Sequence, residues 1–298
     1  MELKFTDVTK KFEDFTAVDK VNLILEKGVY GLLGVNGAGK TTLMRMLCTL
    51  LVPSSGCILY DGKDIFKMDS EYRNLIGYLP QDFGYYPDFT VRDYLLYIAS
   101  IKGIRPTVAK KRAKELLEKV GLSKAEHLKM KKISGGMKRR VGIAQAMLND
   151  PRILIFDEPT AGLDPNERIR FRNLISEIAE DSIVLLSTHI VSDIEYIANR
   201  VFLMKEGRIS HTGTTEELVS DLKERVWFCH VKKEQVKDYT HKYRIANIRT
   251  MSDEVELRII SKEKPCENAS LIQGTLEDVF LYYFDESGKK DGDDHDYI

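Results

Sequence analysis

One short stretch near the N-terminus constrains this chain more than any other. Residues 34–42 read Gly-Val-Asn-Gly-Ala-Gly-Lys-Thr-Thr, which matches the phosphate-binding (Walker A) pattern G-x-x-x-x-G-K-T. An apolar run at 29–33 precedes it, and a run without Pro or Gly at 43–47 follows it. The sequence therefore predicts a buried strand, a phosphate loop and a helix in succession, which is the context that this motif requires.

Each residue type in the loop has a physical reason. Glycines let backbone N–H groups approach phosphate oxygens because no Cβ lies in the way. The following helix begins at about Lys40, so its positive end faces the same phosphates. Lys40 can reach the β- and γ-phosphates, and Thr41 offers its hydroxyl to Mg²⁺. The expected nucleotide-binding residues of this loop are Gly34, Asn36, Gly37, Ala38, Gly39, Lys40, Thr41 and Thr42.

The composition sets limits on the class of protein. A length of 298 residues corresponds to about two domains, and a formal net charge of −1 points to no particular partner. A bilayer-spanning helix needs about 18 apolar residues, and no apolar run approaches this length. The N-terminus has no signal-peptide pattern. Cys48, Cys57, Cys229 and Cys266 are scattered, which is typical of reduced thiols in a cytosolic chain.

Apolar strands alternate with helical patterns along much of the chain. Alternating residues at 2–8 and 21–25 predict an antiparallel sheet ahead of the phosphate loop. Apolar runs at 152–158 and 182–188 flank a helix predicted at 165–180. This alternation, with polar residues at the carboxyl ends of the strands, predicts an α/β fold with a parallel sheet.

Two carboxylates end the apolar strand at 152–158. The carboxyl end of such a strand lies at the same sheet edge as the phosphate loop. Asp157 therefore fits the carboxylate that holds Mg²⁺, and Glu158 can act as general base on a water that attacks the γ-phosphate.

A second stretch, Ile133-Ser134-Gly135-Gly136-Met137, has the features of another phosphate-binding end. Its glycines leave backbone N–H groups open, and the helix that follows points its positive end at whatever binds there. The alternative is an ordinary helix N-cap at Ser134. Two phosphate-binding ends are too many for one nucleotide within one chain.

Two further features allow more than one interpretation. Phe12 could stack on a purine ring, or it could be a core residue of a small sheet, which local sequence favours. The helical region at 90–147 is rich in Lys and Arg. This excess of positive charge fits contact with anionic lipid headgroups or an acidic partner, or a solvated helical face.

Taken together, the motifs resemble the ATP-binding subunit of an ABC transporter over about residues 2–220. The phosphate loop, the signature stretch at 133–137 and the Walker B strand at 153–158 occur in the family's order. Ala161-Gly162-Leu163-Asp164 matches the D-loop. Met137 and Ile133 differ from the commoner Gln and Leu of the signature, and Phe12 stands where the family places an adenine-stacking aromatic, more often Tyr.

The resemblance implies a fold and a set of roles. The fold is an ABC-type P-loop NTPase, with a RecA-like parallel core, an N-terminal antiparallel β-subdomain and a helical subdomain. Gln81 in the Q-loop senses Mg²⁺ and the attacking water. His189 holds the γ-phosphate and positions the water of Glu158. The metal residues are Thr41, Gln81 and Asp157, and the further nucleotide-binding residues are Phe12, Ser134, Gly135, Gly136 and Asp164.

The resemblance also implies partners. Two copies form a head-to-tail dimer, with each Mg²⁺–ATP between the phosphate loop of one and Ser134–Gly136 of the other, and Asp164 lies across the interface. Separate membrane subunits carry the transport path, and the aromatic segment 83–89 forms part of the groove that receives one of them. The expected location is the cytoplasmic face of the cell membrane, with no nucleic acid partner.

The expected domains are an ABC nucleotide-binding domain at 1–221, with its helical subdomain at about 82–148, a small α+β domain at 222–284 and a charged, disordered tail at 285–298. Residues 274–281, Gly-Thr-Leu-Glu-Asp-Val-Phe-Leu, resemble the C-terminal segment of ABC-2 type exporter ATPases, including antibiotic and multidrug exporters. The alternatives are a soluble ABC-type ATPase without a permease, such as a cofactor-assembly ATPase, and a nucleotide-binding regulator that does not hydrolyse.

Overall fold

The structure, a computed structural model, describes residues 1–251 and 253–284. The chain divides into one unit, Met1–Thr212, and a second unit that starts at Gly213. Each unit has its own sheets and its own hydrophobic core. The segment expected to be a charged tail, 285–298, lies outside the described residues. The domain boundaries expected from the sequence stay predictions.

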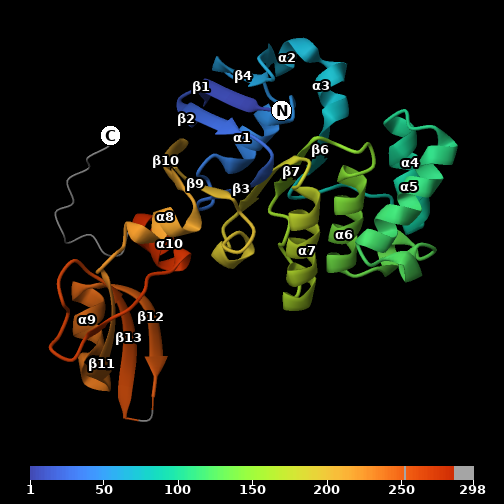
Figure 1. Cartoon of the computed structure of the whole chain (residues 1–298). Helices are drawn as coiled ribbons and strands as arrows, with labels where there is room; N and C mark the ends of the chain where they lie inside the picture. The colour runs from blue at the N-terminus through green and yellow to red at the C-terminus, as the bar shows by residue number, and fades with distance from the viewer. Residues whose placement is uncertain (252, 285–298) are drawn as a thin grey trace. The chain divides into compact units, whose positions relative to one another are not determined.

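A six-stranded sheet carries the phosphate loop in the first unit (Figure 1). Its strands lie in the order β10 (Arg208–Gly213), β9 (Arg200–Lys205), β3 (Gly28–Leu33), β8 (Ile183–Thr188), β7 (Ile153–Asp157) and β6 (Ile76–Leu79). From β9 to β6, neighbouring strands run parallel. Every residue of β7 and β8 is buried, as expected for parallel strands that are covered on both faces.

A smaller antiparallel sheet shares a core with the phosphate-loop helix. Its strands lie in the order β2 (Phe15–Leu25), β1 (Leu3–Phe12), β4 (Ser55–Tyr60) and β5 (Lys63–Asp64). Helix α1 (Lys40–Leu47) buries Leu43 and Leu47 in one cluster with residues of both sheets, such as Phe5 and Ile155. The helix behind the phosphate loop is thereby held by both sheets.

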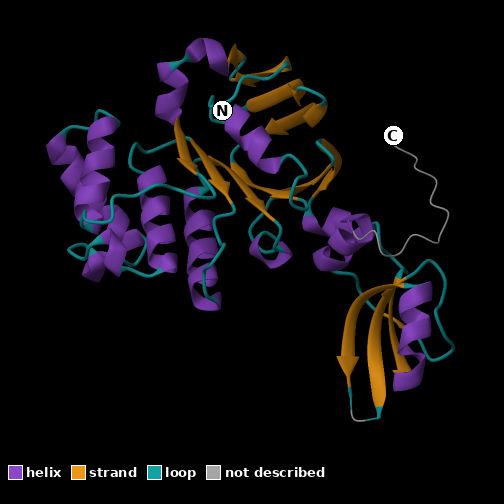
Figure 2. Cartoon of the chain, turned by 180° about the vertical axis from the view of Figure 1, so that it is seen from behind, coloured by secondary structure: helices purple, strands orange, loops and turns teal. Residues whose placement is uncertain are grey.

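Besides α1, the first unit contains the α-helices α2 (Ile65–Met68), α3 (Ser70–Leu75), α4 (Val91–Ile101), α5 (Pro106–Lys119), α6 (Gly135–Ala146) and α7 (Pro165–Ile178). Thr90 caps α4, because its hydroxyl oxygen accepts a hydrogen bond from the Asp93 N–H. In both views α6 lies between α7 and the pair α4–α5 (Figures 1 and 2). Among the described residues, no helix is long and apolar enough to cross a bilayer.

The second unit is a small α+β structure with a four-stranded sheet. Its antiparallel sheet has the order β12 (Arg244–Thr250), β13 (Glu254–Ile260), β11 (Val226–Lys232) and β14 (Ser270–Leu271). Its helices are α8 (Thr215–Ser220), α9 (Val236–Lys242) and α10 (Leu276–Phe284). Figure 2 shows α9 along one face of the strands, where Cys229, Val231 and Leu257 form the core. Arg258 anchors α10 through a 2.6 Å ion pair to the buried Asp278.

Candidate functional site

Four neighbouring strands bring the expected site residues to one edge of the central sheet. Leu33 at the end of β3 lies opposite Thr188 at the end of β8, and Asp157 of β7 lies opposite Ser187. Leu79 of β6 lies opposite Phe156. Because parallel strands end at a common edge, the segments that follow them lie next to one another. These segments carry Gly34, His189, Glu158 and Gln81.

The phosphate loop joins β3 to α1, as predicted. Gly37 and Gly39 have φ values of 84° and 104°, a region that side chains with a Cβ rarely adopt. A Cβ on Gly39 would also lie 2.3 Å from the backbone oxygen of Ala17. Helix α1 begins at Lys40 and has no acidic residue in its first turn, so its positive end is not neutralised from within. The loop therefore has the shape and the polarity of a phosphate cradle.

Lys40 lies across its own loop. Its Nζ donates to the carbonyl oxygens of Gly34 (2.6 Å) and Val35 (3.1 Å), and the side chain is buried. Burial lowers the pKa of Lys40, whereas the nearby charges of Glu158 and Asp157 raise it. A phosphate in this loop would offer the ammonium a charged acceptor in place of neutral carbonyls, and charge-assisted hydrogen bonds are the stronger kind.

Asp157 ends β7 with one carboxylate oxygen satisfied and one not. Its Oδ1 accepts from Ser187 Oγ at 2.6 Å. Its Oδ2 is buried and has no hydrogen-bond partner among the described residues. A buried, unsatisfied carboxylate oxygen costs free energy, and carboxylate and hydroxyl oxygens are the ligands that Mg²⁺ prefers. Asp157, together with the half-buried Thr41 at the start of α1, therefore fits a Mg²⁺ ion.

Glu158 and His189 approach each other from neighbouring segments. Glu158 has a φ of 50°, and its N–H donates to the Ser187 carbonyl (3.2 Å) and Ser187 Oγ (3.1 Å). His189 Nδ1 lies 3.0 Å from Glu158 Oε2. Oε2 has no partner with hydrogen-bond geometry among the described residues, so this is a close approach of two groups without a formed hydrogen bond. Glu158 is buried, whereas half of the His189 side chain is exposed.

Gln81 and Phe12 are both accessible. Gln81 follows β6 directly, its side chain is exposed, and its carbonyl accepts from Arg139 Nη1 at 2.7 Å. Phe12 ends β1 with 45% of its surface exposed, and the Lys10 ammonium lies 5.2 Å from its ring centroid. Phe12 is thus not the core residue that local sequence favours, and its ring is available for stacking.

The signature stretch begins α6. Ser134 caps this helix by accepting from the Met137 N–H at 3.1 Å, and Ser134 and Gly135 are exposed. A Cβ on Gly136 would lie 2.0 Å from Glu167 Oε2, so a larger residue here would force the Glu167 carboxylate to move. Asp164 caps α7 by accepting from the Glu167 N–H at 2.8 Å. Glu167 thereby joins the signature helix to the D-loop residue.

Two residues of this region were not expected from the sequence, Ser187 and Arg139. Ser187, the donor to Asp157, is a polar residue in an apolar strand, and that interruption is a usable signal. Arg139 gives no such signal, because it stands in the basic run 138–140 and resembles a surface residue. The structure shows Arg139 buried, with its guanidinium on the carbonyl oxygens of Pro80, Gln81, Asp157, Glu158 and Pro159.

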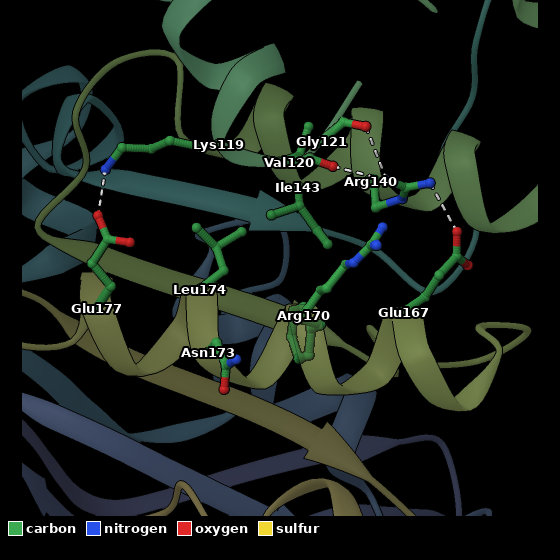
Figure 3. Close-up of a pocket in the computed structure, with 11 residues that line it drawn as sticks. Lys119, Val120, Gly121, Arg140, Ile143, Glu167, Arg170, Asn173, Leu174 and Glu177 are labelled. Atoms are coloured by element: carbon green, nitrogen blue, oxygen red, sulfur yellow. Dashed lines mark hydrogen bonds and ion pairs between the residues drawn. The ribbon is translucent and has the colours of Figure 1, made fainter. Parts of the chain in front are cut away.

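A separate cavity of about 300 Å³ lies where α5, α6 and α7 meet (Figure 3). Arg140 of α6 pairs with Glu167 of α7 at 2.8 Å, and Lys119 of α5 pairs with Glu177 of α7 at 2.9 Å. None of the residues predicted to bind nucleotide lines this cavity. The two ion pairs connect α7 to α5 and α6, and residues of these pairs line the cavity.

Comparison with known proteins decides the family. The sequence profile described as "ABC transporter" matches residues 18–161. The chain is 38% identical over 232 residues to the uncharacterized ABC transporter ATP-binding protein YxlF of Bacillus subtilis, which covers 78% of this chain and 77% of that protein. The chain belongs to the ABC transporter family. It is also 41% identical over 210 residues to the bacitracin transport ATP-binding protein BcrA of Bacillus licheniformis, covering 70% of this chain and 68% of BcrA.

Solved structures of ABC proteins agree with this assignment. A dimeric bacterial ABC transporter cassette, MJ0796, superposes with a TM-score of 0.65 at 25% identity, covering 71% of this chain and 98% of the cassette. Structure cbiO1 of Clostridium perfringens, part of the ABC transporter complex cbiONQ, superposes with a TM-score of 0.65 at 31% identity, covering 74% of this chain and 90% of cbiO1. The predicted ABC-type P-loop fold is confirmed, and the chain is an ATP-binding subunit and an ABC ATPase.

Proposed function

We propose that this ABC ATPase powers export through separate membrane subunits by hydrolysing ATP with Glu158 as general base. The observation that carries the proposal is the edge of the central sheet, where His189 Nδ1 approaches Glu158 Oε2 to 3.0 Å beside Asp157. A buried carboxylate next to an imidazole, at the edge where the phosphate loop begins, has the arrangement that attack on a γ-phosphate needs.

The residues divide the work of hydrolysis. The loop 34–42 and Lys40 hold the phosphates, and Phe12 stacks on the adenine. Thr41, Asp157 and Gln81 would hold Mg²⁺, which neutralises phosphate charge when bound. Glu158 accepts a proton from water while the water oxygen bonds to the γ-phosphorus and the bond to the leaving ADP oxygen breaks. His189 holds the γ-phosphate and keeps the water in line with that bond.

A second copy of the chain completes the site in this proposal. Ser134 and Gly135 are exposed at the positive end of α6, ready for a phosphate that the same subunit does not supply. The solved cassette MJ0796, which is similar over 71% of this chain, is dimeric. We infer a head-to-tail dimer in which Ser134–Gly136 closes over the ATP of the other copy, with Asp164 across the interface.

Membrane subunits are the other proposed partners. The similar protein BcrA is a bacitracin transport ATP-binding protein, and cbiO1 is part of a transporter complex. Tyr86, Phe89 and Tyr97 form an aromatic cluster with ring centroids 5.0–5.7 Å apart, and Tyr86 and Tyr97 are exposed. Tyr86 and Phe89 lie in the segment 83–89, which is expected to receive a membrane subunit, and Tyr97 packs on them from α4. Such a subunit would hold the chain at the cytoplasmic face of the membrane.

Two measurements test the proposal. Phosphate release by the purified chain, with ATP and Mg²⁺, tests hydrolysis, and a chain that binds ATP without releasing phosphate would be a regulator instead. Purification from a detergent extract tests the partner. We expect co-purification with an integral membrane protein, and recovery only as a free dimer would instead favour an ATPase that works without a permease.

A further inference from the structure

Arg139 is a buried arginine whose entire guanidinium group contacts backbone oxygens. Only 6% of its surface is exposed. Nε donates to Pro159 (3.0 Å), Nη1 donates to Pro80 (3.0 Å) and Gln81 (2.7 Å), and Nη2 donates to the carbonyls of Asp157 and Glu158. A guanidinium has five N–H donors, so each one has an acceptor here.

The cost of burying this charge explains why the contacts must be complete. Burial lowers the pKa of Arg139, and the negative charges of Asp157, Asp82 and Glu158 act in the opposite direction. Arginine nevertheless stays protonated in proteins. A buried charge is tolerated only where hydrogen bonds and opposite charges compensate its lost hydration. A lysine here would keep the charge but would present three donors from a single point, which cannot cover five acceptors.

The five acceptors belong to two segments that carry the proposed chemistry. Pro80 and Gln81 follow β6, whereas 157–159 end β7 and turn away from it. Arg139 itself comes from α6, about one and a half helical turns after Ser134. One side chain therefore connects the signature helix to the backbone of both the Q-loop glutamine and the general base.

We propose that Arg139 is a positioning residue for ATP hydrolysis, which fixes the backbone of Gln81 and Glu158 to α6. The helix that carries the signature stretch is thereby tied to the backbone that carries the proposed general base. The inference rests on the proposed function. It assigns to Arg139 no contact with ATP, so its removal acts on turnover and leaves nucleotide affinity unchanged.

The test uses the full-length chain and three variants. Arg139→Gln removes the guanidinium, and Arg139→Lys keeps the charge without the fork. Arg112→Gln is the matched control, because Arg112 Nη1 also donates to a backbone carbonyl, that of Leu148 at 2.9 Å, in the same unit but at neither segment. We expect kcat to fall on the order of 100-fold in Arg139→Gln, the loss that a small misplacement of reacting groups produces. We expect the kcat of Arg139→Lys to lie between those of Arg139→Gln and the wild type, and the kcat of Arg112→Gln to equal that of the wild type.

Two further measurements separate positioning from mere support of the fold. Titration with labelled ATP and circular dichroism should give the same Kd and the same folded fraction for Arg139→Gln as for wild type. If Arg139 acts through Gln81, the variant Arg139→Gln/Gln81→Ala loses much less activity than the product of the two single losses. Multiplicative losses, or an unchanged kcat in Arg139→Gln or Arg139→Lys, would overturn the inference.

The same assays keep the two proposals apart. A wild-type chain that releases no phosphate contradicts the proposed function. If the wild type hydrolyses ATP and Arg139→Lys is equally active, only the role of Arg139 is contradicted. This outcome can be read even where Arg139→Gln does not fold.

Discussion

His189 Nδ1 lies 3.0 Å from Glu158 Oε2, although the two residues follow different strands. The contact exists because β7 and β8 pair in parallel with Asp157 opposite Ser187, which brings the residues after both strands together. The carboxylate is buried and the imidazole is half exposed, so His189 is the member of the pair that solvent can reach. In the proposed mechanism this orientation directs the carboxylate and the imidazole at one water molecule.

The general base is tested by Glu158→Gln. This variant keeps the shape of the side chain and removes the proton acceptor, so we expect ATP binding to persist, ATP-bound dimers to accumulate and phosphate release to fall by at least about 100-fold. Phosphate-release kinetics and analytical gel filtration with ATP measure both effects. Glu180→Gln, at an exposed position after α7, should behave as wild type. Unchanged turnover in Glu158→Gln would remove Glu158 from the mechanism.

Lys40→Ala should lose affinity for ATP. The ammonium supplies charge-assisted hydrogen bonds, each worth about 1.5–3 kcal/mol, so the Kd should rise by about 10- to 100-fold. Fluorescence titration with labelled ATP measures it. Lys27→Ala is the control, because that exposed lysine pairs with Asp181 outside the loop. Equal affinities in the two variants would contradict the assignment of the loop.

Asp157→Asn should raise the Mg²⁺ concentration that supports half-maximal ATPase activity. The substitution removes the charge from the buried Oδ2, and we expect a shift of about tenfold or more. A Mg²⁺ titration at saturating ATP measures it. A proportional loss of activity at every Mg²⁺ concentration would show that Asp157 acts without the metal.

Tyr94→Phe should destabilise the chain at neutral pH and do so less at high pH. Tyr94 Oη contacts the Gly84 carbonyl at 3.1 Å, and losing the hydroxyl costs about 1 kcal/mol. Burial raises the pKa of Tyr94 to about 12, so between pH 10 and 12 the unfolded chain ionises while the folded chain holds its proton. The stability due to this hydroxyl therefore falls as the pH rises through that window.

Urea unfolding of wild type and Tyr94→Phe at pH 8 and pH 11 tests the sign. The difference in free energy of unfolding should shrink at pH 11, because only the wild type loses the contribution of Tyr94. A difference that is constant or grows would show that the phenol ionises at least as easily in the folded chain as in the unfolded one, which would contradict the raised pKa.

Gly136→Ala should destabilise the chain by about 1–3 kcal/mol through overpacking. Its Cβ would lie 2.0 Å from Glu167 Oε2, and Glu167 would have to leave its 2.8 Å ion pair with Arg140. In a Glu167→Ala background the same substitution should cost much less. Urea unfolding of the four proteins in this double-mutant cycle measures the coupling. Additive costs would show that Glu167 does not set the space at Gly136.

The sequence predicted the parts of the site that depend on local pattern. Residues 34–42 have glycines and a lysine at fixed spacing between a strand and a helix, and the structure has that order at Leu33 and Lys40. Asp157 likewise ends an apolar strand as expected. The confirmed fold class follows from the same alternation of strands and helices. The functional roles of the individual residues stay predictions.

Other relationships could not be predicted from local pattern, because they depend on strand order, and the shared role of His189 and Glu158 was expected only from the family resemblance. The approach of His189 to Glu158 requires β7 and β8 to be neighbours, which no local pattern specifies. Arg139 is the clearest case, since its acceptors are backbone oxygens and leave no mark on residue types. Local sequence favours a core position for Phe12, but the structure exposes it, because a strand pattern does not show which end of a hairpin is exposed.

The alignment of strand ends also has a consequence for folding. The segments at Gly34, Gln81, Glu158 and His189 are far apart in the sequence, and they meet only when β3, β8, β7 and β6 have all paired. Such long-range parallel pairing closes large loops and is intrinsically slow. If these segments form the nucleotide site as proposed, partly folded chains have no complete site, and ATP that binds only the folded sheet would shift the folding equilibrium toward it.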